Sequence, residues 1–279
     1  MGYAVQIPRI AKIRGAIHRY NVLLTPGPMM SVYNRVRKAA RHNGPVLLVG
    51  EKGVGKEMMA REIYMLSVKG YGFEYVCGHG KKSPDIDREL YGKRRQSSDD
   101  ASKQFIGSFS YSRRGMMYLD GIDFLDVASQ EKLLRVINSG EFMPENCTKV
   151  MKTNARIIAG TSEDLAKLVR KGCFRHDLYE RMSEYHEINI PSLRRRIGEL
   201  GTWLSYFLSI SPQALTKKVS FSQESMDVLT GHIWHENLDE LKNFAERALT
   251  AHGVQIPEGQ NPGEFHAKIV RPVDLERLL

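Results

Sequence analysis

The chain has 279 residues, of which 42% are hydrophobic and 26% charged, and its formal net charge is +9. This composition is ordinary for a globular protein and excludes fibrous and low-complexity chains. No apolar run approaches the roughly 20 residues that span a bilayer, and three scattered cysteines exclude a disulfide framework. We therefore expect a cytoplasmic protein with no membrane segment. The basic excess favours an anionic partner such as a nucleotide or nucleic acid, although a solvated basic surface is an equal alternative.

Apolar runs alternate with helical patterns over the first two thirds of the chain. Five short apolar runs are typical of buried strands: residues 46–49, 73–76, 116–119, 156–159 and 187–190. Apolar residues at helical spacing predict helices between them: residues 57–67, 83–90, 129–139 and 164–170. Strands separated by helices indicate an α/β fold with a central parallel sheet covered on both faces.

The last third of the chain has a different pattern. Helical periodicity continues through residues 200–210, 222–230 and 238–251 without further strand signals, which predicts a small all-α domain. Residues 257–263 are rich in glycine and proline, and we expect a loose tail there with a short helix at 273–279.

Residues 50–57 read Gly-Glu-Lys-Gly-Val-Gly-Lys-Glu and directly follow the first predicted strand. This fits the phosphate-loop pattern G-x-x-x-x-G-K, in the required place between a strand and a helix. The glycines let backbone N–H groups point at phosphate oxygens, while the helix dipole and Lys56 add positive charge. A purely structural turn is disfavoured because all these features agree. The predicted nucleotide-binding residues are Gly50, Glu51, Lys52, Gly53, Val54, Gly55, Lys56 and Glu57.

The predicted strand at 116–119 ends in Asp120, and Asp123 follows three residues later. A nucleotide loop needs a second strand that delivers carboxylates to the metal and the attacking water, so Asp120 is the predicted magnesium ligand. The next position normally supplies a glutamate base, but here it is Gly121. Because a general base contributes about 10²–10⁴ in rate, its loss predicts weak or absent hydrolysis unless Asp123 substitutes.

Two arginines, Arg175 and Arg181, lie six residues apart before the last predicted strand. An arginine supplied by a neighbouring subunit stabilises the transition-state charge of phosphoryl transfer. The alternative is that both are ordinary surface residues, as most arginines are. Cys77 with His79 and Cys173 with His176 have the spacing of metal ligands. Neither pair has a second pair of the same spacing to complete a site, so we favour ordinary buried or surface residues over metal ligands.

Together these segments, from residue 22 to residue 251, resemble the AAA+ domain of sigma-54-dependent transcriptional activators, the bacterial enhancer-binding proteins. Residues 50–57 resemble the family's G-E-x-G-x-G-K-E, and residues 89–92, Glu-Leu-Tyr-Gly, resemble its E-L-F-G. Residues 132–142 resemble K-L-L-R-V followed by G-E-F, and residues 174–181 resemble F-R-x-D-L-Y-x-R. The resemblance implies a P-loop NTPase with a five-stranded sheet and a helical lid, bound ATP and Mg, and ring assembly. It also implies that Arg175 and Arg181 act in trans.

The chain departs from the family pattern at several functional positions. Residues 96–101, Gln-Ser-Ser-Asp-Asp-Ala, replace the G-A-F-T-G-A loop that contacts the sigma factor, which argues against the usual sigma-54 contact. Gly121 replaces the catalytic glutamate, Ser162 the sensor asparagine, and Asp239 the lid arginine; Cys77 falls near the asparagine that restrains that glutamate. These changes favour nucleotide binding over turnover.

We expect four segments: an N-terminal extension (1–21), an AAA+ α/β domain (22–194), a helical lid (195–252) and a tail (253–279). The terminal segments are too short for a DNA-binding domain of the chain's own. The leading hypothesis is an ATP-binding regulator with weak or absent hydrolysis. The alternatives are a competent activator ATPase with atypical catalytic residues, and a non-enzymatic partner that joins rings of an intact homologue. The expected assembly is a homo-oligomeric ring or a ring shared with a homologue.

Overall fold

The computed structural model describes residues 27–67, 72–93, 105–112, 114–211, 217–252, 254–255, 268–270, 272–275 and 278. The altered loop at 96–101 lies outside these residues, and so do the whole N-terminal extension and most of the tail. The chain divides into two compact units. Val32–Glu51 and Gly55–Ile190 form the first, here called the sheet unit. Met1–Ser31, Lys52–Val54 and Pro191–Leu279 form the second, here called the lid unit.

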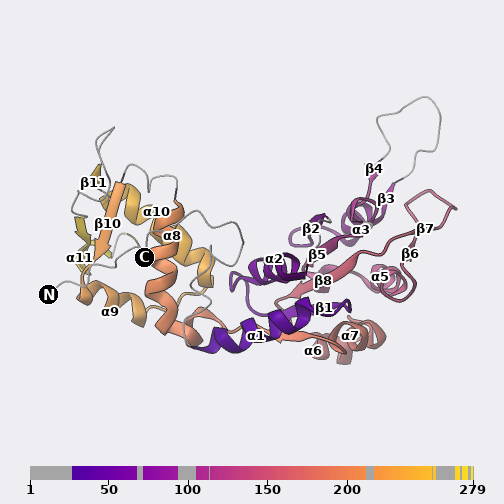
Figure 1. Ribbon diagram of the computed structural model, residues 1–279, viewed down its shortest axis with the longest axis horizontal. Helices are drawn as coiled ribbons and strands as arrows, with labels where there is room; N and C mark the ends of the chain where they lie inside the picture. The colour runs from indigo at the N-terminus through magenta and orange to yellow at the C-terminus, as the bar shows by residue number, and fades with distance from the viewer. Residues whose placement is uncertain are drawn as a thin grey trace. The chain divides into compact units, whose positions relative to one another are not determined.

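The sheet unit is built on a five-stranded sheet in the order β2-β5-β8-β1-β9, and every neighbouring pair is parallel (Figure 1). This confirms the predicted α/β fold with a parallel five-stranded sheet. In the register of the sheet, Asp120 lies between Cys77 of β2 and Gly160 of β8, so the carboxyl ends of three strands meet at one edge. The strands are β1 (Val46–Val49), β2 (Phe73–Cys77), β5 (Met116–Asp120), β8 (Arg156–Thr161) and β9 (Glu187–Asn189).

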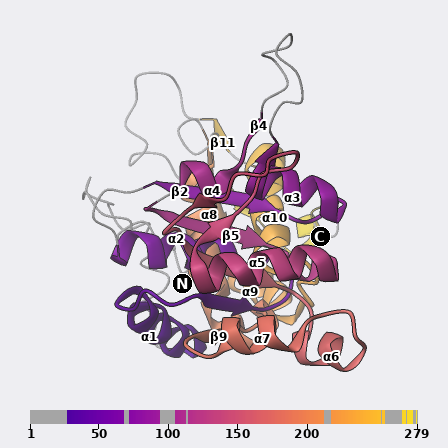
Figure 2. The ribbon, with the colours of Figure 1, turned by 90° about the vertical axis from the view of Figure 1, so that its right-hand side faces the viewer.

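Helices connect these strands, and α3, α5 and α7 face the viewer in Figure 2. Local sequence sets their ends: Asp126 caps α5 by accepting a hydrogen bond from the Ser129 N–H, and Gly140 ends it in a left-handed conformation. Asp164 caps α6 in the same way. The helices are α1 (Pro28–Ala40), α2 (Lys56–Ser67), α3 (Ser83–Tyr91), α4 (Ser108–Tyr111), the 3₁₀ turn η3 (Ile122–Phe124), α5 (Val127–Ser139), α6 (Leu165–Arg170) and α7 (His176–Ser183). Two short hairpins complete the unit: β3 (Gly92–Lys93) with β4 (Phe105–Ile106), and β6 (Glu141–Phe142) with β7 (Met151–Lys152).

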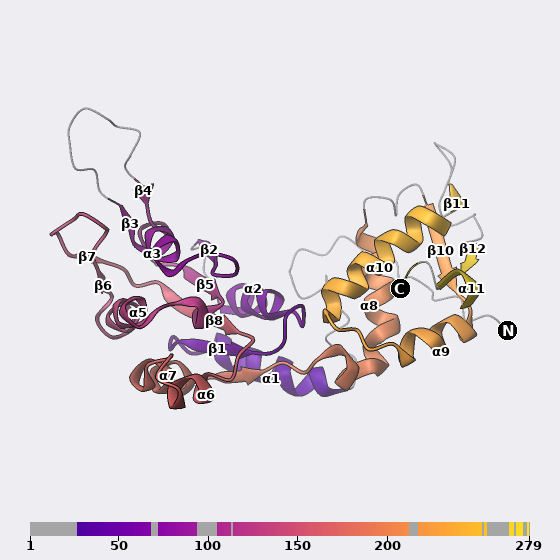
Figure 3. The same cartoon turned by 180° about the vertical axis from the view of Figure 1, so that it is seen from behind.

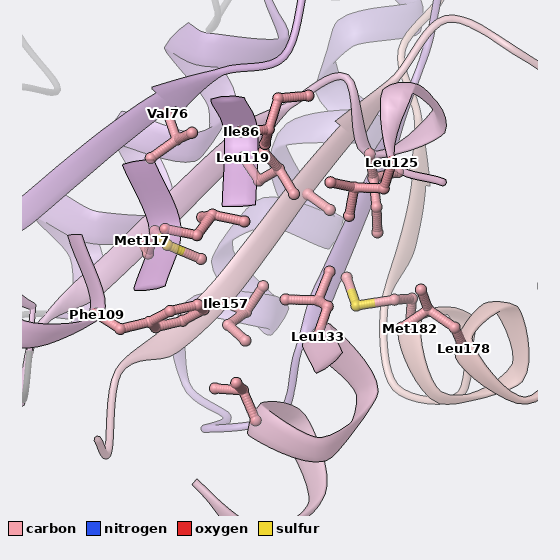
Figure 4. Close-up of a cluster of buried hydrophobic side chains, with 14 of the residues drawn as sticks. Val76, Ile86, Phe109, Met117, Leu119, Leu125, Leu133, Ile157, Leu178 and Met182 are labelled. Atoms are coloured by element: carbon pink, nitrogen blue, oxygen red, sulfur yellow. The ribbon is translucent and has the colours of Figure 1, made fainter. Parts of the chain in front are cut away.

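A continuous hydrophobic cluster fills the space between the sheet and helices α3, α5 and α7 (Figure 4). Alternate strand residues such as Tyr118 and Ile158 are buried on the other face, where α2 packs against β1, β5 and β8. Because both faces of the sheet are buried, the strands hold the polar groups at their carboxyl ends in fixed positions. The cluster contains Val76, Ile86, Met117, Leu119, Leu133, Ile157, Leu178 and Met182.

The lid unit contains the predicted helices and also a small sheet. The helices are η4 (Leu193–Glu199), α8 (Leu200–Ile210), α9 (Gln223–Gly231), α10 (Asn237–His252) and α11 (Pro272–Leu275). Trp203, Trp234 and Phe244 are fully buried among them. None of the helices in the described part of the chain is long and apolar enough to cross a bilayer.

The prediction that the lid is all-α was wrong in one respect. Strand β10 (Lys217–Phe221) pairs with β11 (Val254–Gln255) and β12 (Lys268–Val270), which lie before and after residues 257–263, the part of the tail expected to be loose (Figure 3). Strands of two and three residues are too short to show a period of two, so the sequence pattern carried no signal for them.

Candidate functional site

Lys56 is the first residue of α2, and its side chain is buried. Its Nζ donates to the carbonyl oxygens of Gly50 (2.8 Å) and Glu51 (3.0 Å) and to Oγ of Ser162 (2.9 Å). These acceptors follow the neighbouring strands β1 and β8, so the ammonium group is held at the carboxyl edge of the sheet. Ser162, expected at the sensor position, therefore contacts the phosphate-loop lysine.

The loop before Lys56 has the backbone conformation of an anion-binding turn. Gly53 and Gly55 have φ values of 74° and 102°, in the left-handed region that favours glycine, and Val54 between them is buried. The loop leads into α2, a helix of 12 residues. An ammonium group, backbone amides and a helix N-terminus are the donor set that binds phosphate. These residues fit the phosphates of a nucleotide.

Glu57 follows the lysine, at the position where a hydroxyl often binds magnesium. Its Oε1 accepts a hydrogen bond from Nε of Arg61 at 2.7 Å, one turn later on α2. Both side chains are about half exposed, so this pair contributes little to stability.

The carboxylate of Asp120 lies at the end of β5 and is held by its neighbours. The Tyr118 hydroxyl donates to Asp120 Oδ1 at 3.0 Å, and Nε2 of His79 lies 3.6 Å from the same oxygen. Burial, and then the Asp120 charge, raises the pKa of Tyr118, so the phenol remains a donor at neutral pH. A fixed carboxylate at this strand end is a suitable oxygen ligand for Mg²⁺.

Gly121 adopts a left-handed conformation, with φ 90° and ψ 55°. A Cβ atom at this position would lie 2.7 Å from Cδ2 of Phe124. The Gly121 N–H also donates to the Gly160 carbonyl at 2.9 Å, which fixes the peptide. A glutamate therefore cannot enter this position without local rearrangement. The sequence shows a missing carboxylate; the structure adds a left-handed backbone that disfavours any side chain at this position.

Asp123 lies in η3 and has a structural partner. The hydroxyl of Thr161, at the end of β8, donates to Asp123 Oδ1 at 2.6 Å. The same hydroxyl accepts a hydrogen bond from the Glu163 N–H at 3.0 Å. Asp123 thus joins the turn after β5 to the turn after β8.

Arg175 is the residue before α7 and Arg181 lies in its last turn, and both are engaged in ion pairs within the chain. Arg175 makes two parallel hydrogen bonds with Asp177, at 3.0 and 2.8 Å, and a third with Glu131 at 3.1 Å. The bonds with Asp177 raise the pKa of Arg175. Arg181 donates to Glu184 at 2.7 Å, and its guanidinium lies 5.4 Å from the ring centroid of Tyr185. Both side chains remain about one third exposed, at the surface of the sheet unit.

Sequence reasoning gave Tyr118, His79 and Thr161 no role in holding the predicted carboxylates. Tyr118 was detectable, because it precedes Asp120 by two residues on one strand and so shares its face of the sheet. His79 and Thr161 reach their partners only through the pairing of strands distant in sequence. In the lid unit, Asp239 lies in the first turn of α10, and its Oδ2 lies 3.1 Å from where a Cβ on Gly53 would be, so this carboxylate is close to Gly53 of the phosphate loop.

Comparison with known proteins identifies the family. The sequence matches the family described as the Sigma-54 interaction domain over residues 23–188, more than half of the chain. The chain belongs to the Sigma-54 interaction domain family. Its fold is the α/β AAA+ fold, as predicted from the sequence.

Curated members of this family are transcriptional regulators. The chain is 31% identical over 240 residues to a Nif-specific regulatory protein of Azotobacter vinelandii, covering 85% of this chain and 46% of that protein. It is 30% identical over 242 residues to the Psp operon transcriptional activator of Escherichia coli K12, covering 86% and 74%. The chain thus spans about half the length of the first relative and three quarters of the second.

Solved structures of a family relative are similar. NtrX from Brucella abortus in complex with ADP has a TM-score of 0.74 and 27% identity, covering 85% of this chain and 51% of that one. NtrX in complex with ATP gives the same TM-score and identity. A closed state of Hsp104, at 15% identity and a TM-score of 0.61, shares the fold alone.

Proposed function

We propose that this chain is an ATP-binding regulatory domain of the sigma-54 activator type in which ATP hydrolysis is weak or absent. The observation that carries this proposal is the contrast at one sheet edge. Lys56 is anchored by three acceptors beside a loop shaped for phosphate. The position after Asp120 is a left-handed glycine with a ring at clashing distance from any Cβ.

The ligand of this site is proposed to be ATP with magnesium. Lys56 and the backbone amides of residues 53–55 would hold the phosphates, and Asp120 would hold the metal. The bound metal neutralises phosphate charge and polarises the phosphoryl group. The structures of NtrX with ADP and with ATP support this choice of ligand, because they concern a relative with the same fold.

Two features support weak hydrolysis. A general base must come within hydrogen-bond reach of the attacking water, and Gly121 offers no side chain. Asp123 is the remaining candidate, but its carboxylate already accepts a 2.6 Å hydrogen bond from Thr161. We propose a structural role for Asp123 and a metal-binding role for Asp120.

Ring assembly is proposed from the two arginines. Arg175 and Arg181 lie at the surface in ion pairs with acidic side chains of α5 and α7, or next to α7. Exposed ion pairs cost little to exchange, so these guanidinium groups would leave their carboxylates for the phosphates of a neighbouring subunit. The ring would consist of copies of this chain or include a homologue, and contact with sigma-54 through residues 96–101 would differ from the family's usual mode. In the proposed domain division, residues 22–194 bind the nucleotide and 195–252 form the lid.

The proposal is tested by titrating the purified chain with a fluorescent ATP analogue and measuring its size with and without ATP. We expect saturable, magnesium-dependent binding and a larger particle with ATP. Arg175→Ala should bind ATP normally and remain small. A wild-type chain that binds no nucleotide would refute the proposal, and one that binds ATP but stays monomeric would refute its assembly step.

A further inference from the structure

Three consecutive carbonyl groups of the phosphate loop accept hydrogen bonds from elements that follow the sheet in the chain. The bonds run from Asn237 Nδ2 to the Lys52 carbonyl (2.8 Å), from the Leu238 N–H to the Gly53 carbonyl (2.9 Å), and from Arg196 Nη2 to the Val54 carbonyl (2.7 Å). The three donor residues and the three acceptor residues all belong to the lid unit.

The two side-chain donors are buried and fixed by their own contacts. The Arg196 side chain is 0% exposed, lies 3.5 Å from a carboxylate oxygen of Glu199, and stacks over Trp203 at 5.9 Å. Asn237 is also fully buried, and its Oδ1 accepts a hydrogen bond from the Leu193 N–H at 2.8 Å. Buried polar groups with several partners have little freedom to move. Both therefore present rigid donors to the loop.

The fit between these elements is close at Gly53. A Cβ atom on this residue would lie 2.1 Å from the carbonyl oxygen of Glu236. The glycine is therefore required both for its left-handed φ of 74° and for the approach of the residues that precede α10.

Holding these carbonyls determines where the loop's N–H groups point. In a planar trans peptide, the C=O of one residue and the N–H of the next point in opposite directions. Fixing the carbonyls of Lys52, Gly53 and Val54 toward their donors thus turns the N–H groups of residues 53–55 away from them. These are the amides that a phosphate loop offers to an anion.

We infer that Arg196 and Asn237 are positioning residues for nucleotide recognition, which aim the phosphate-loop amides by holding the carbonyls behind them. The inference rests on the proposed binding of ATP to this loop. The lid residues would then affect nucleotide binding through the backbone of the loop. This effect would be separate from any direct contact that Asp239 makes with the nucleotide.

The test compares two isosteric substitutions on α10. Asn237→Asp keeps the oxygen that accepts from Leu193 but puts a second oxygen against the Lys52 carbonyl. Asn243→Asp makes the same change on the same helix, at an exposed position. We expect Asn237→Asp to weaken ATP binding about tenfold or more, since one lost hydrogen bond also leaves an acceptor facing an acceptor. Asn243→Asp should bind like the wild type. A folded Asn237→Asp variant with wild-type affinity would overturn the inference.

Arg196→Lys provides a second variant. It keeps the buried positive charge beside Glu199 but lacks the guanidinium N–H that donates to the Val54 carbonyl. It should also weaken ATP binding while circular dichroism shows a folded protein. Hydrogen exchange of the nucleotide-free protein separates this inference from the proposed function. Amides 53–55 should exchange faster in Asn237→Asp than in Asn243→Asp, even if the wild type binds no ATP. Equal exchange in the two variants would overturn the inference.

If neither Asn237→Asp nor Arg196→Lys folds, the wild-type protein supplies the test. Saturating ATP should slow exchange at the Leu238 amide, which is bonded to the Gly53 carbonyl, more than at the amides of α9. Equal slowing at both places would overturn the inference.

Discussion

Two strand ends at the same edge of one sheet, those of β1 and β5, differ in what they can do for a nucleotide. After β1, the chain turns through left-handed glycines to a buried lysine with three oxygen acceptors. After β5, it offers one anchored carboxylate, Asp120, and then a left-handed Gly121 packed beside Phe124. The first end has the kinds of groups that bind phosphate; the second has the carboxylate that we propose as a metal ligand but no adjacent base. The comparison gives the physical reason for our proposal: nucleotide binding and hydrolysis would rely on different strand ends, so one could be kept without the other.

The largest effect on ATP binding is expected at Lys56. Lys56→Ala removes the ammonium group from the loop, and charge-assisted hydrogen bonds are worth about 1.5–3 kcal/mol each, so ATP affinity should fall by roughly 10–100-fold. A titration with a fluorescent ATP analogue measures this. Lys149→Ala, an exposed position in the same unit, is the control and should leave affinity unchanged. Equal affinity of wild type and Lys56→Ala would place the nucleotide elsewhere.

The second prediction concerns Gly121. Gly121→Ala introduces a Cβ at φ 90° and 2.7 Å from the Phe124 ring. The strain costs about 1–2 kcal/mol and the overpacking about 1–3 kcal/mol. The two costs should add and lower the free energy of unfolding, which urea unfolding measures. Gly172→Ala is the matched control, because its φ is 72° and no atom lies within 4 Å of its Cβ position. It should cost the strain alone. Equal losses for both variants would show that the second strand end has room for a side chain.

The third prediction concerns Thr161, which holds Asp123. Thr161→Val removes a buried hydroxyl that bonds both Asp123 and the Glu163 amide, and should cost about 1–3 kcal/mol of unfolding free energy. Asp123→Asn keeps an acceptor oxygen for that hydroxyl and should cost less. If Asp123→Asn leaves stability intact but lowers phosphate release, then Asp123 acts as a base and the contrast between the two strand ends is lost.

The smallest effect is expected at Asp126, which follows η3 and caps α5. Asp126→Ala should cost about 1 kcal/mol, the usual value of an N-cap. The bond from the Ser129 amide is the main cause that lowers the pKa of Asp126. Since this folded-state pKa lies below the ordinary value of 3.8, the charge contributes stability above that pH and loses it as the pH falls through the lowered pKa. Urea midpoints at pH 7 and pH 3 should therefore differ less for Asp126→Ala than for the wild type. An equal change of the urea midpoint in both proteins would contradict the proposed contribution of the Asp126 charge to stability.

The sheet and the phosphate loop could be predicted from sequence because both depend on local order. Strand β1, the glycines and Lys56 lie within eleven residues of one another, and helices separate the five strands of the sheet along the chain. The loss of a carboxylate at Gly121 was equally visible. Its left-handed conformation was not, because it depends on the bond to Gly160 and on the Phe124 ring.

Other features required contacts between residues distant in sequence. Arg196 and Asn237 reach the loop across intervals of 142 and 185 residues, so no local pattern marks them as partners of Val54 and Lys52. Strand β10 similarly depends on β12, which lies far along the chain. In both places, tertiary packing supplied information that periodicity could not.

The most direct test of the account is phosphate release per bound ATP by the wild-type chain, at ATP concentrations that saturate it in the binding titration. Lys56→Ala from a parallel purification gives the background. We predict that the wild type binds ATP and releases phosphate at a rate indistinguishable from that background, or only slightly above it. Turnover on the order of 1 s⁻¹ or faster that Lys56→Ala abolishes would contradict the claim that this chain keeps the nucleotide site and has lost its turnover.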